Sequence, residues 1–280
     1  MKYILFNPLS NNHKGADNVA IVKEKIGEAT ECSVLDLDLR DFVSKLNNDD
    51  QIYILGGDGT INKFINRLGG VVPKQEIYLF KSGSGNDFLN DVKENETGDF
   101  VLLNKYLENL PTVEVNGNSY FFINGVGFGI DGYCCEVGDK MREEKPGEEI
   151  NYTKIAIKGL LFKFKKVNAT VEVDGVSESY KNVWLAPTMK GRFYGGGMMI
   201  APAQDRFAED KSITNVIYKT RSKLKALINF PSIFKGEHVN KKGLVVIRKG
   251  STIKVTFDKP CALQVDGETI LNVTTYTAHI

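Results

Sequence analysis

Cysteine and histidine, which build many metal and nucleophilic sites, are scarce in this sequence. The chain contains four cysteines and three histidines, namely Cys32, Cys134, Cys135, Cys261, His13, His238 and His279. No cysteines have CxxC spacing, so a disulfide framework or a zinc site is not expected and the thiols should be reduced. No GxSxG elbow is present, and so few histidines give little support to a nucleophilic triad or a histidine-based metal site.

Long apolar runs are also missing. The N-terminus has only a short apolar run that ends at Asn7-Pro8, which is too short for the hydrophobic region of a signal peptide. No stretch reaches the ~20 apolar residues that a membrane-spanning helix needs. We therefore expect a cytoplasmic protein without a transmembrane segment, whose contact with the inner face of a membrane is peripheral.

Charge is distributed unevenly, although the formal net charge is only +1. The first 150 residues carry 15 basic and 25 acidic side chains, a net charge of −10, and the remaining 130 carry 21 and 10, a net charge of +11. Between Lys211 and Lys249, ten Lys or Arg residues accompany a single acid, Glu237. This basic stretch should attract an anionic surface. It contains no recognisable nucleic-acid-binding module, so we expect a lipid partner and no nucleic acid.

Part of the basic stretch has an amphipathic pattern. Its apolar residues Leu224, Leu227, Ile228, Phe230, Ile233 and Phe234 interleave with Lys223, Lys225 and Lys235. The pattern is typical of a helix that lies at a membrane interface. It fits equally well a basic-faced helix packed on the rest of its own domain, and both interpretations stay open.

The two halves of the chain predict different kinds of fold. In the first half, short apolar runs at 3–6, 32–37, 52–55 and 77–80 predict buried strands, and apolar residues at helical spacing around 19–26, 61–68 and 101–107 predict helices. This alternation indicates a parallel sheet covered by helices. Beyond about residue 111, alternating runs joined by Asn116-Gly117 and Asp174-Gly175 predict antiparallel hairpins. The second half should be an antiparallel β-sandwich or barrel, interrupted by a helical, charged insertion at about 139–166.

Two glycine-rich loops follow predicted strands. The run 52–55 leads into Gly56-Gly57-Asp58-Gly59-Thr60 and then a helix. Glycines allow backbone amides to approach phosphate oxygens, and a helix N-terminus favours an anion. The motif is neither a Walker loop nor GxGxxG. Taken alone, it also fits a tight strand-to-helix turn.

The second loop, Lys81–Phe88, brings another carboxylate, Asp87. These two loops, together with Asn7-Pro8, would suit a triphosphate and its metal.

At this point the chain resembles the diacylglycerol kinase catalytic family, which includes bacterial soluble lipid kinases and sphingosine kinases and is distantly related to NAD kinases. The resemblance covers nearly the whole chain. It is carried by Asn7-Pro8, GGDGTIN at 56–62, GSGNDF at 83–88, GGGMMIAPA at 195–203 and QVDGE at 264–268.

The resemblance implies a Rossmann-like nucleotide-binding α/β domain at 1–112, a β-sandwich lipid domain at 113–271, and a return of residues 272–280 to the first domain. It implies ATP and Mg²⁺ as cofactors, held in a cleft between the domains. By matched position the nucleotide would be held by Asn7, Gly56, Gly57, Asp58, Gly59, Thr60, Asn62, Gly83, Ser84 and Asn86. Asp58 and Asp87 would help to place magnesium and phosphates. Of the C-terminal acids, Asp266 is preferred as the base for the substrate hydroxyl and Glu268 as its support; alone, Asp266-Gly267 would be a hairpin turn.

One segment departs from the family pattern. In bacterial members a structural magnesium is associated with a DG-x-L segment, which here reads Asp210-Lys211-Ser212-Ile213. Binding would use Asp210 and the carbonyls near Phe207 and Ser212. If Lys211 must adopt a positive φ, its side chain costs about 1 kcal/mol or more.

The expected function is ATP-dependent phosphorylation of a lipid hydroxyl, with diacylglycerol as acceptor and phosphatidic acid as product. Two alternatives stay open: an NAD kinase-like enzyme that phosphorylates a soluble nucleotide, and a catalytically silent homologue that binds nucleotide or lipid. The sequence does not choose between a monomer and a homodimer.

Overall fold

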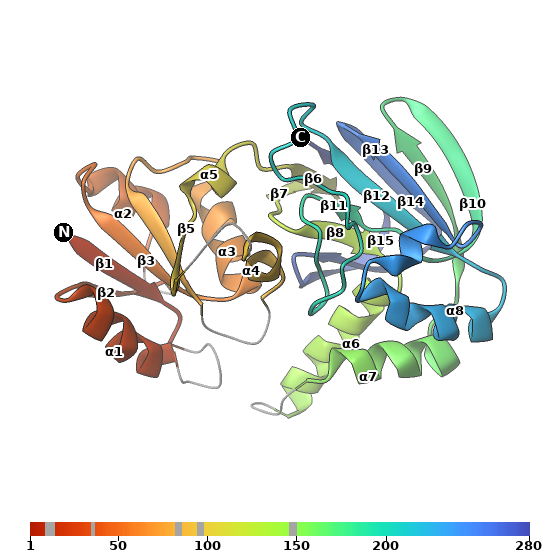
Figure 1. The fold of residues 1–280 in the computed structure, drawn as a ribbon, viewed down its shortest axis with the longest axis horizontal. Helices are drawn as coiled ribbons and strands as arrows, with labels where there is room; N and C mark the ends of the chain where they lie inside the picture. The colour runs from red at the N-terminus through yellow and green to blue at the C-terminus, as the bar shows by residue number, and fades with distance from the viewer. Residues whose placement is uncertain (9–14, 35–36, 82–85, 94–97, 146–149) are drawn as a thin grey trace. The chain divides into compact units, whose positions relative to one another are not determined.

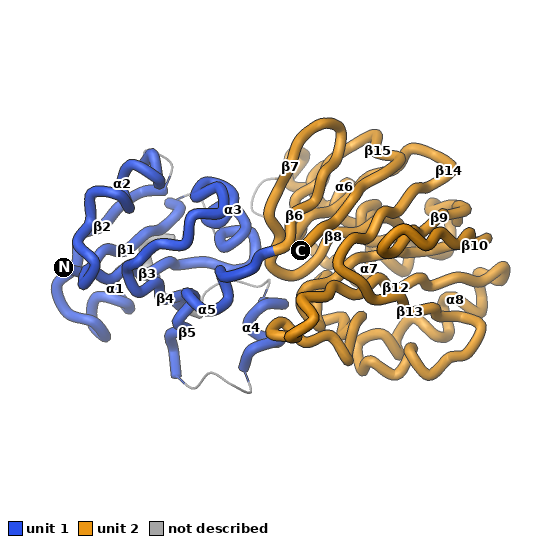
Figure 2. Tube along the Cα trace, turned by 90° about the horizontal axis from the view of Figure 1, so that it is seen from above, with its two compact units in different colours: residues 1–110 blue, residues 111–280 orange. Residues whose placement is uncertain are grey.

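The chain divides into two compact units, Met1–Leu110 (unit 1) and Pro111–Ile280 (unit 2), which Figure 2 distinguishes by colour. The computed structural model describes residues 1–8, 15–34, 37–81, 86–93, 98–145 and 150–280. The division falls two residues before the boundary expected after residue 112.

Unit 1 contains a five-stranded sheet. Its strands are β1 (Lys2–Phe6), β2 (Thr30–Ser33), β3 (Gln51–Gly56), β4 (Glu76–Lys81) and β5 (Phe100–Leu102), in the spatial order β2-β1-β3-β4-β5. The first four are parallel, and β5 runs antiparallel to β4. Ile52, Ile54, Ile77 and Leu79 are almost fully buried, as expected of central strands with helices on both faces.

In the described residues, four helices connect these strands, namely α1 (Gly15–Ile26), α2 (Leu39–Lys45), α3 (Asp58–Leu68) and α4 (Asp87–Val92), and α5 (Asn104–Leu107) follows β5 (Figure 1). In α3 the buried residues Ile61, Phe64, Ile65 and Leu68 recur at helical spacing, and Gly69 ends the helix with φ 61°. The helix expected at 101–107 is instead a strand followed by the short α5. Val101 is fully buried and pairs with Leu79, so sheet pairing overrides the local helical pattern.

Unit 2 is built on a ten-stranded sheet. Its strands are β6 (Thr112–Val115), β7 (Asn118–Phe121), β8 (Gly125–Phe128), β9 (Val167–Val173), β10 (Val176–Leu185), β11 (Thr188–Met189), β12 (Ile213–Lys219), β13 (Val245–Gly250), β14 (Thr252–Val265) and β15 (Glu268–His279). The long strand β14 pairs with β9 through 253–257 and with β8 through 263–265, so the sheet folds back on itself. Its core includes the Phe128 ring, whose centroid lies 4.6 Å from Phe257 and 5.2 Å from Tyr276.

Three hairpins of unit 2 have the turn residues that their geometry requires. Asn116-Gly117 joins β6 to β7, Asp174-Gly175 joins β9 to β10, and Asp266-Gly267 joins β14 to β15. All six residues have positive φ, from 47° to 93°. This is the type I′ pattern, which favours Asn or Asp followed by Gly.

The expectation that residues 272–280 return to unit 1 is corrected by the structure. These residues belong to β15, which pairs with β14 and β6 inside unit 2. Val273, Tyr276 and Ala278 are at most 1% exposed within the main core of that unit. Removing the strand would expose these side chains and leave the edges of β14 and β6 unpaired.

A helical layer lies against one face of this sheet (Figure 1). It comprises α6 (Ile130–Glu144), α7 (Tyr152–Lys158), the π-helix η1 (Gly159–Lys163), α8 (Lys223–Asn229) and the short helices η2 (Phe230–Ile233) and η3 (Glu237–Asn240). Their apolar side chains pack around Trp184 in a second core cluster. In the part of the chain that the structure describes, no helix is both long enough and apolar enough to cross a membrane.

Candidate functional site

In unit 1, three polar strand ends lie along one edge of the sheet. β1, β3 and β4 are adjacent and parallel, so their carboxyl ends share an edge. Asn7 follows β1, Gly57-Asp58 follows β3, and on the segment after β4 Asn86 is the N-cap of α4 and Asp87 its first residue. The predicted Gly83 and Ser84 lie outside the described residues.

Gly56 allows α3 to start directly at the end of β3. A Cβ atom at Gly56 would come within 2.1 Å of the Thr60 hydroxyl oxygen, so a larger residue would push the first helical turn away. The Gly57 carbonyl accepts hydrogen bonds from the amides of Thr60 (3.0 Å) and Ile61 (3.2 Å). The Gly56–Thr60 segment therefore brings the N-terminus of the eleven-residue α3 to the strand edge, where the positive end of the helix dipole favours an anion.

The Asp58 carboxylate connects the two glycine-rich loops. Its Oδ2 accepts the backbone N–H of Asp87 at 2.8 Å, and its Oδ1 accepts that of Phe88 at 2.9 Å. These are the first two amides of α4, which the helix itself cannot satisfy. Asp58 thus fixes the start of α4, a structural role that the sequence interpretation missed. Asp87 is only 6% exposed, so it is held in place rather than solvated.

Asn62 lies on the covered side of α3. It is 6% exposed. Its backbone carbonyl and its side-chain Oδ1 both accept hydrogen bonds from Nδ2 of the Asn66 side chain, at 2.9 and 3.3 Å. Asn62 is therefore fixed within its helix.

In unit 2, the Asp266 turn is held by an unusually large number of backbone hydrogen bonds. Oδ2 of Asp266 accepts the N–H of Ile123 at 2.7 Å, and Oδ1 accepts those of Asn124 and Gly125 at 2.8 and 2.9 Å. The Asp266 amide donates to the Gly125 carbonyl at 2.9 Å. Asp266 is 9% exposed and has φ 47°. Its carboxylate anchors the hairpin to the segment before β8.

Glu268 lies two residues further along and begins β15. In contrast to Asp266, it is exposed. The Gly267 amide donates to Oε1 of Gln264 at 2.9 Å, which closes the turn from inside. The hairpin therefore holds one acid within the protein and presents the other at the surface of the unit.

A further acid, Asp131 at the start of α6, was not identified from the sequence. It is 6% exposed, and among the residues that the structure describes no donor satisfies hydrogen-bond geometry at either carboxylate oxygen. Burial raises the pKa of Asp131 to about 6, and the neighbouring amides of Gly132 and Gln264 offset only part of that effect. The sequence feature that could have indicated a buried acid is the position of Asp131 as the one charged residue in the apolar run 126–134.

The expected structural magnesium site does not fit the residues present. Oδ1 of Asp210 accepts the Ser212 hydroxyl at 2.6 Å, and Oδ2 lies 3.0 Å from the Lys249 ammonium. These two donors hold the pKa of Asp210 below its usual value. Lys211 has φ 45°, the positive φ considered for it from the sequence, and Phe207 is 54% exposed. An ammonium group thus neutralises this acid. Among the described residues, no three His, Cys, Asp or Glu side chains are grouped to bind a metal.

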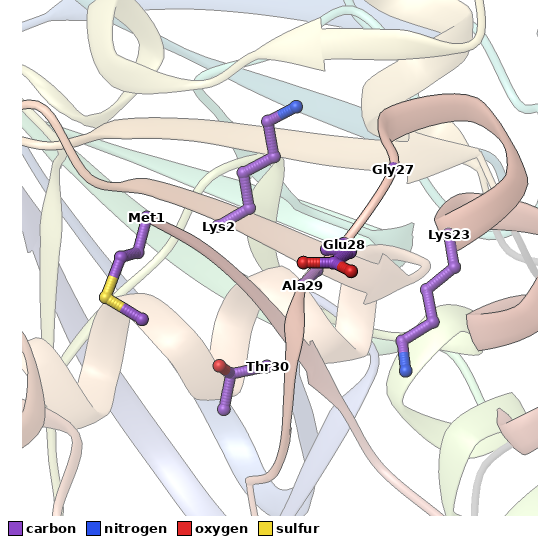
Figure 3. Close-up of a pocket in the computed structure, with 7 residues that line it drawn as sticks. All are labelled: Met1, Lys2, Lys23, Gly27, Glu28, Ala29 and Thr30. Carbon is purple, nitrogen blue, oxygen red and sulfur yellow. The ribbon is translucent and has the colours of Figure 1, made fainter.

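A hollow of unit 1 lies at the opposite strand ends from these loops. It measures about 610 Å³ and is lined by Met1, Lys2, Lys23, Gly27, Glu28, Ala29 and Thr30 (Figure 3). Lys23 lies in the last turn of α1, and the other residues lie at the amino ends of β1 and β2 and on the segment that precedes β2. Ligands of parallel sheets bind at the carboxyl ends of strands, so this hollow is not assigned to the site.

Family models match both units. Residues 2–113 match the diacylglycerol kinase catalytic domain, and residues 124–278 match the YegS C-terminal NAD kinase beta sandwich-like domain. The chain belongs to the diacylglycerol kinase family of lipid kinases. This family assignment confirms the resemblance based on the loops and the fold class of both halves.

Individual relatives agree with this assignment. A protein named "Diacylglycerol kinase" from Mycobacterium tuberculosis is 28% identical over 235 residues, covering 81% of this chain and 71% of the relative. A Bacillus subtilis protein named "Putative lipid kinase YtlR" is 23% identical over 241 residues, covering 78% and 74%. A solved structure described as a "putative diacylglycerol kinase" from Bacillus anthracis has a TM-score of 0.69 at 15% identity, covering 99% of this chain and 91% of that chain. At 15% identity, this structural likeness supports the fold alone. Membership of the family indicates that the chain is a kinase-type phosphotransferase.

Proposed function

We propose that the protein transfers the γ-phosphate of ATP to the hydroxyl group of a lipid, with diacylglycerol as acceptor and phosphatidic acid as product. The observation that carries this proposal is the match of residues 2–113 to the diacylglycerol kinase catalytic domain. The 28% identical relative from Mycobacterium tuberculosis, named a diacylglycerol kinase, supports the choice of acceptor.

In this proposal the strand-end loops of unit 1 bind the nucleotide. The half-buried start of α3 would offer backbone amides to phosphate oxygens. Asp58 fixes the start of α4 beside it. Mg²⁺ bound with ATP would neutralise phosphate charge. Asp58 and Asp87 would supply the oxygen donors that this hard cation prefers.

We assign the proton acceptor to Glu268 and a positioning role to Asp266. Asp266 already accepts three backbone N–H groups, whereas Glu268 is exposed at the start of β15. In the transfer step the lipid hydroxyl oxygen forms a bond to the γ-phosphorus while the bond to the ADP oxygen breaks. Glu268 takes the hydroxyl proton, and no covalent enzyme intermediate is formed.

The activity is tested by incubating the full chain with γ-labelled ATP, Mg²⁺ and either dioctanoylglycerol or NAD. The proposal predicts labelled dioctanoyl phosphatidic acid. Label in NADP instead would identify an NAD kinase-like enzyme. Absence of label with both acceptors, in a chain that still binds ATP, would identify a catalytically silent homologue.

We propose that the protein meets its lipid at the cytoplasmic face of a membrane through an apolar surface on unit 2. Phe162, Leu224 and Ile228 are 75%, 65% and 67% exposed. Their helices η1 and α8 are joined by a hydrogen bond from the Lys223 ammonium to the Leu161 carbonyl, 3.3 Å long. Lys158, Lys163, Lys165 and Lys225, which lie within a few residues of these side chains in the sequence, are also exposed, a composition that suits an anionic bilayer.

Vesicle sedimentation tests this surface. The chain should bind vesicles that contain phosphatidylglycerol more strongly than pure phosphatidylcholine vesicles, and Phe162→Ser with Ile228→Ser should weaken binding. Val176→Ser is the matched control, because Val176 is 61% exposed on the β9–β10 hairpin. Equal binding by all three proteins would contradict the proposal.

A further inference from the structure

Lys190 is a buried lysine without an ionic partner. It follows β11 in unit 2 and is only 6% exposed. In the described part of the chain, no carboxylate lies within ion-pair distance of its ammonium group. A buried charge is expensive unless it is paired. The arrangement therefore suggests that a partner is supplied from outside the chain.

The nearest charges increase the excess of positive charge around Lys190. Burial and repulsion by the Arg206 guanidinium together lower the pKa of Lys190 to about 8, and Asp205 opposes them only partly. Asp205 is itself exposed and accepts the Phe207 amide at 2.8 Å. At pH 7 most Lys190 side chains remain charged, so the Lys190 ammonium and the Arg206 guanidinium are two neighbouring cations that are partly shielded from water.

Lys190, through its backbone, and Arg206, through its guanidinium, are both attached to the segment that anchors the acidic turn. The Asn124 carbonyl accepts the amides of Lys190 (2.9 Å) and Gly191 (3.0 Å). Arg206 donates from Nη1 to the Ile123 carbonyl and from Nη2 to Oδ1 of Asn124, the latter at 2.8 Å. The amides of the same segment, residues 123–125, bind Asp266. The amides of this segment thus bind the Asp266 hairpin, and its oxygen atoms bind the Lys190 backbone and the Arg206 guanidinium.

We propose that Lys190 and Arg206 bind a phosphate oxyanion next to the Asp266 turn. A guanidinium fork and an ammonium are the groups that proteins use most for phosphate. The oxyanion belongs either to a phospholipid headgroup or to free phosphate. As a headgroup site it rests on the proposed lipid kinase activity, but the acceptor would then be an anionic lipid that carries a hydroxyl group in place of diacylglycerol. Binding itself depends on unit 2 alone.

Thermal unfolding of the full chain in sodium phosphate and in sodium chloride of equal ionic strength tests the proposal. A ligand that binds only the folded state raises the unfolding midpoint, by about 3 °C at a concentration tenfold above its Kd. Phosphate should produce this shift in the wild type and in Lys190→Arg. It should be lost in Lys190→Met, which replaces the ammonium by an apolar group of similar length.

The controls separate this site from other phosphate binding. Lys241→Met removes an exposed lysine on the same unit and should keep the shift. Because Lys190 is unpaired, Lys190→Met should unfold in chloride at or above the wild-type midpoint; Lys190→Gln provides a second neutral variant. Phosphate held by the unit 1 loops would stabilise the wild type and Lys190→Met equally, and an equal shift overturns the proposal.

Two lipid probes identify the source of the phosphate. Dihexanoyl phosphatidylglycerol carries a phosphodiester and a hydroxyl group, whereas dihexanoylglycerol carries no charge. A Lys190-dependent shift with the first probe but not the second assigns the site to a headgroup, and a shift with inorganic phosphate alone assigns it to free phosphate. No Lys190-dependent shift with any of the three would overturn it. None of these measurements requires turnover. The phosphate site can therefore be supported even when the test of kinase activity is negative.

Discussion

Asp58 in unit 1 accepts two backbone N–H groups from the neighbouring strand-end loop, whereas Asp266 in unit 2 accepts three from the segment before β8. Both acids were expected to act on magnesium, phosphate or the substrate proton. In both units the acid also fixes a second segment: Asp58 fixes the start of α4, whose first residue is Asp87, and Asp266 fixes the hairpin that leads to Glu268. The difference is one of burial, since Asp266 is 9% exposed and Asp58 lies at a more open strand edge.

The comparison predicts a larger loss of stability in unit 2. Asp266→Ala leaves three buried N–H groups unsatisfied and places alanine at φ 47°, so the free energy of unfolding should fall by about 3–5 kcal/mol. Urea denaturation measures this. Asp174→Ala is the control, because Asp174 occupies the same turn position and its carboxylate accepts the amides of Ser251 and Thr252 at an exposed edge. A loss at Asp266 no greater than that at Asp174 would remove the proposed difference.

Asp131 adds a test of the comparison, because the stability that it contributes should depend on pH. The carboxyl groups of Asp58 and Asp266 are hydrogen-bonded, but that of Asp131 is buried without such bonds and its pKa is raised to about 6. Below pH ~4 both folded and unfolded chains hold this proton; between pH ~4 and 6 only the folded chain does. Wild-type stability should therefore fall across that window relative to Asp131→Asn, by roughly 1–3 kcal/mol. Parallel stability–pH curves for the two proteins would contradict this assignment.

In unit 1 a smaller loss is expected. Asp58→Ala removes the acceptor for the first two amides of α4, which should cost about 1–2 kcal/mol and speed hydrogen exchange at Asp87 and Phe88. Asp38→Ala is a matched control, since Asp38 accepts the amides of Arg40 and Asp41 at the start of α2, at 3.1 Å each. Both variants should lose similar stability. Only Asp58→Ala should weaken ATP binding, and equal ATP affinity in the two would argue against the bridging role.

The sequence predicted much of the scaffold of both sites because the relevant signals are local. Glycine and acidic residues after short apolar runs predicted strand-end loops, and the Asn-Gly and Asp-Gly pairs predicted the type I′ hairpins. The helix expected at 101–107 failed because β5 pairs with a strand more than twenty residues earlier. The return of residues 272–280 to unit 1 failed because β15 completes the sheet of unit 2.

The roles of individual acids were harder to predict because their partners are distant in sequence. Asp58 binds amides 29 and 30 residues away, and Asp266 binds amides 141 to 143 residues away. No local pattern distinguishes an acid that accepts backbone amides from one that binds a proton or a metal. Lys190 was missed for the same reason, because its burial and its proximity to Arg206 arise only from the folding of unit 2.

The division of roles between Asp266 and Glu268 is tested most directly by the turnover of Glu268→Gln. Glu268 is exposed, so the variant should unfold at the wild-type midpoint. Loss of the proton acceptor should lower kcat for dioctanoylglycerol by about 10²–10⁴-fold, with ATP affinity unchanged. A variant that keeps kcat within about threefold of wild type, where a general base contributes at least about 10²-fold, would contradict the assignment of Glu268 as the proton acceptor.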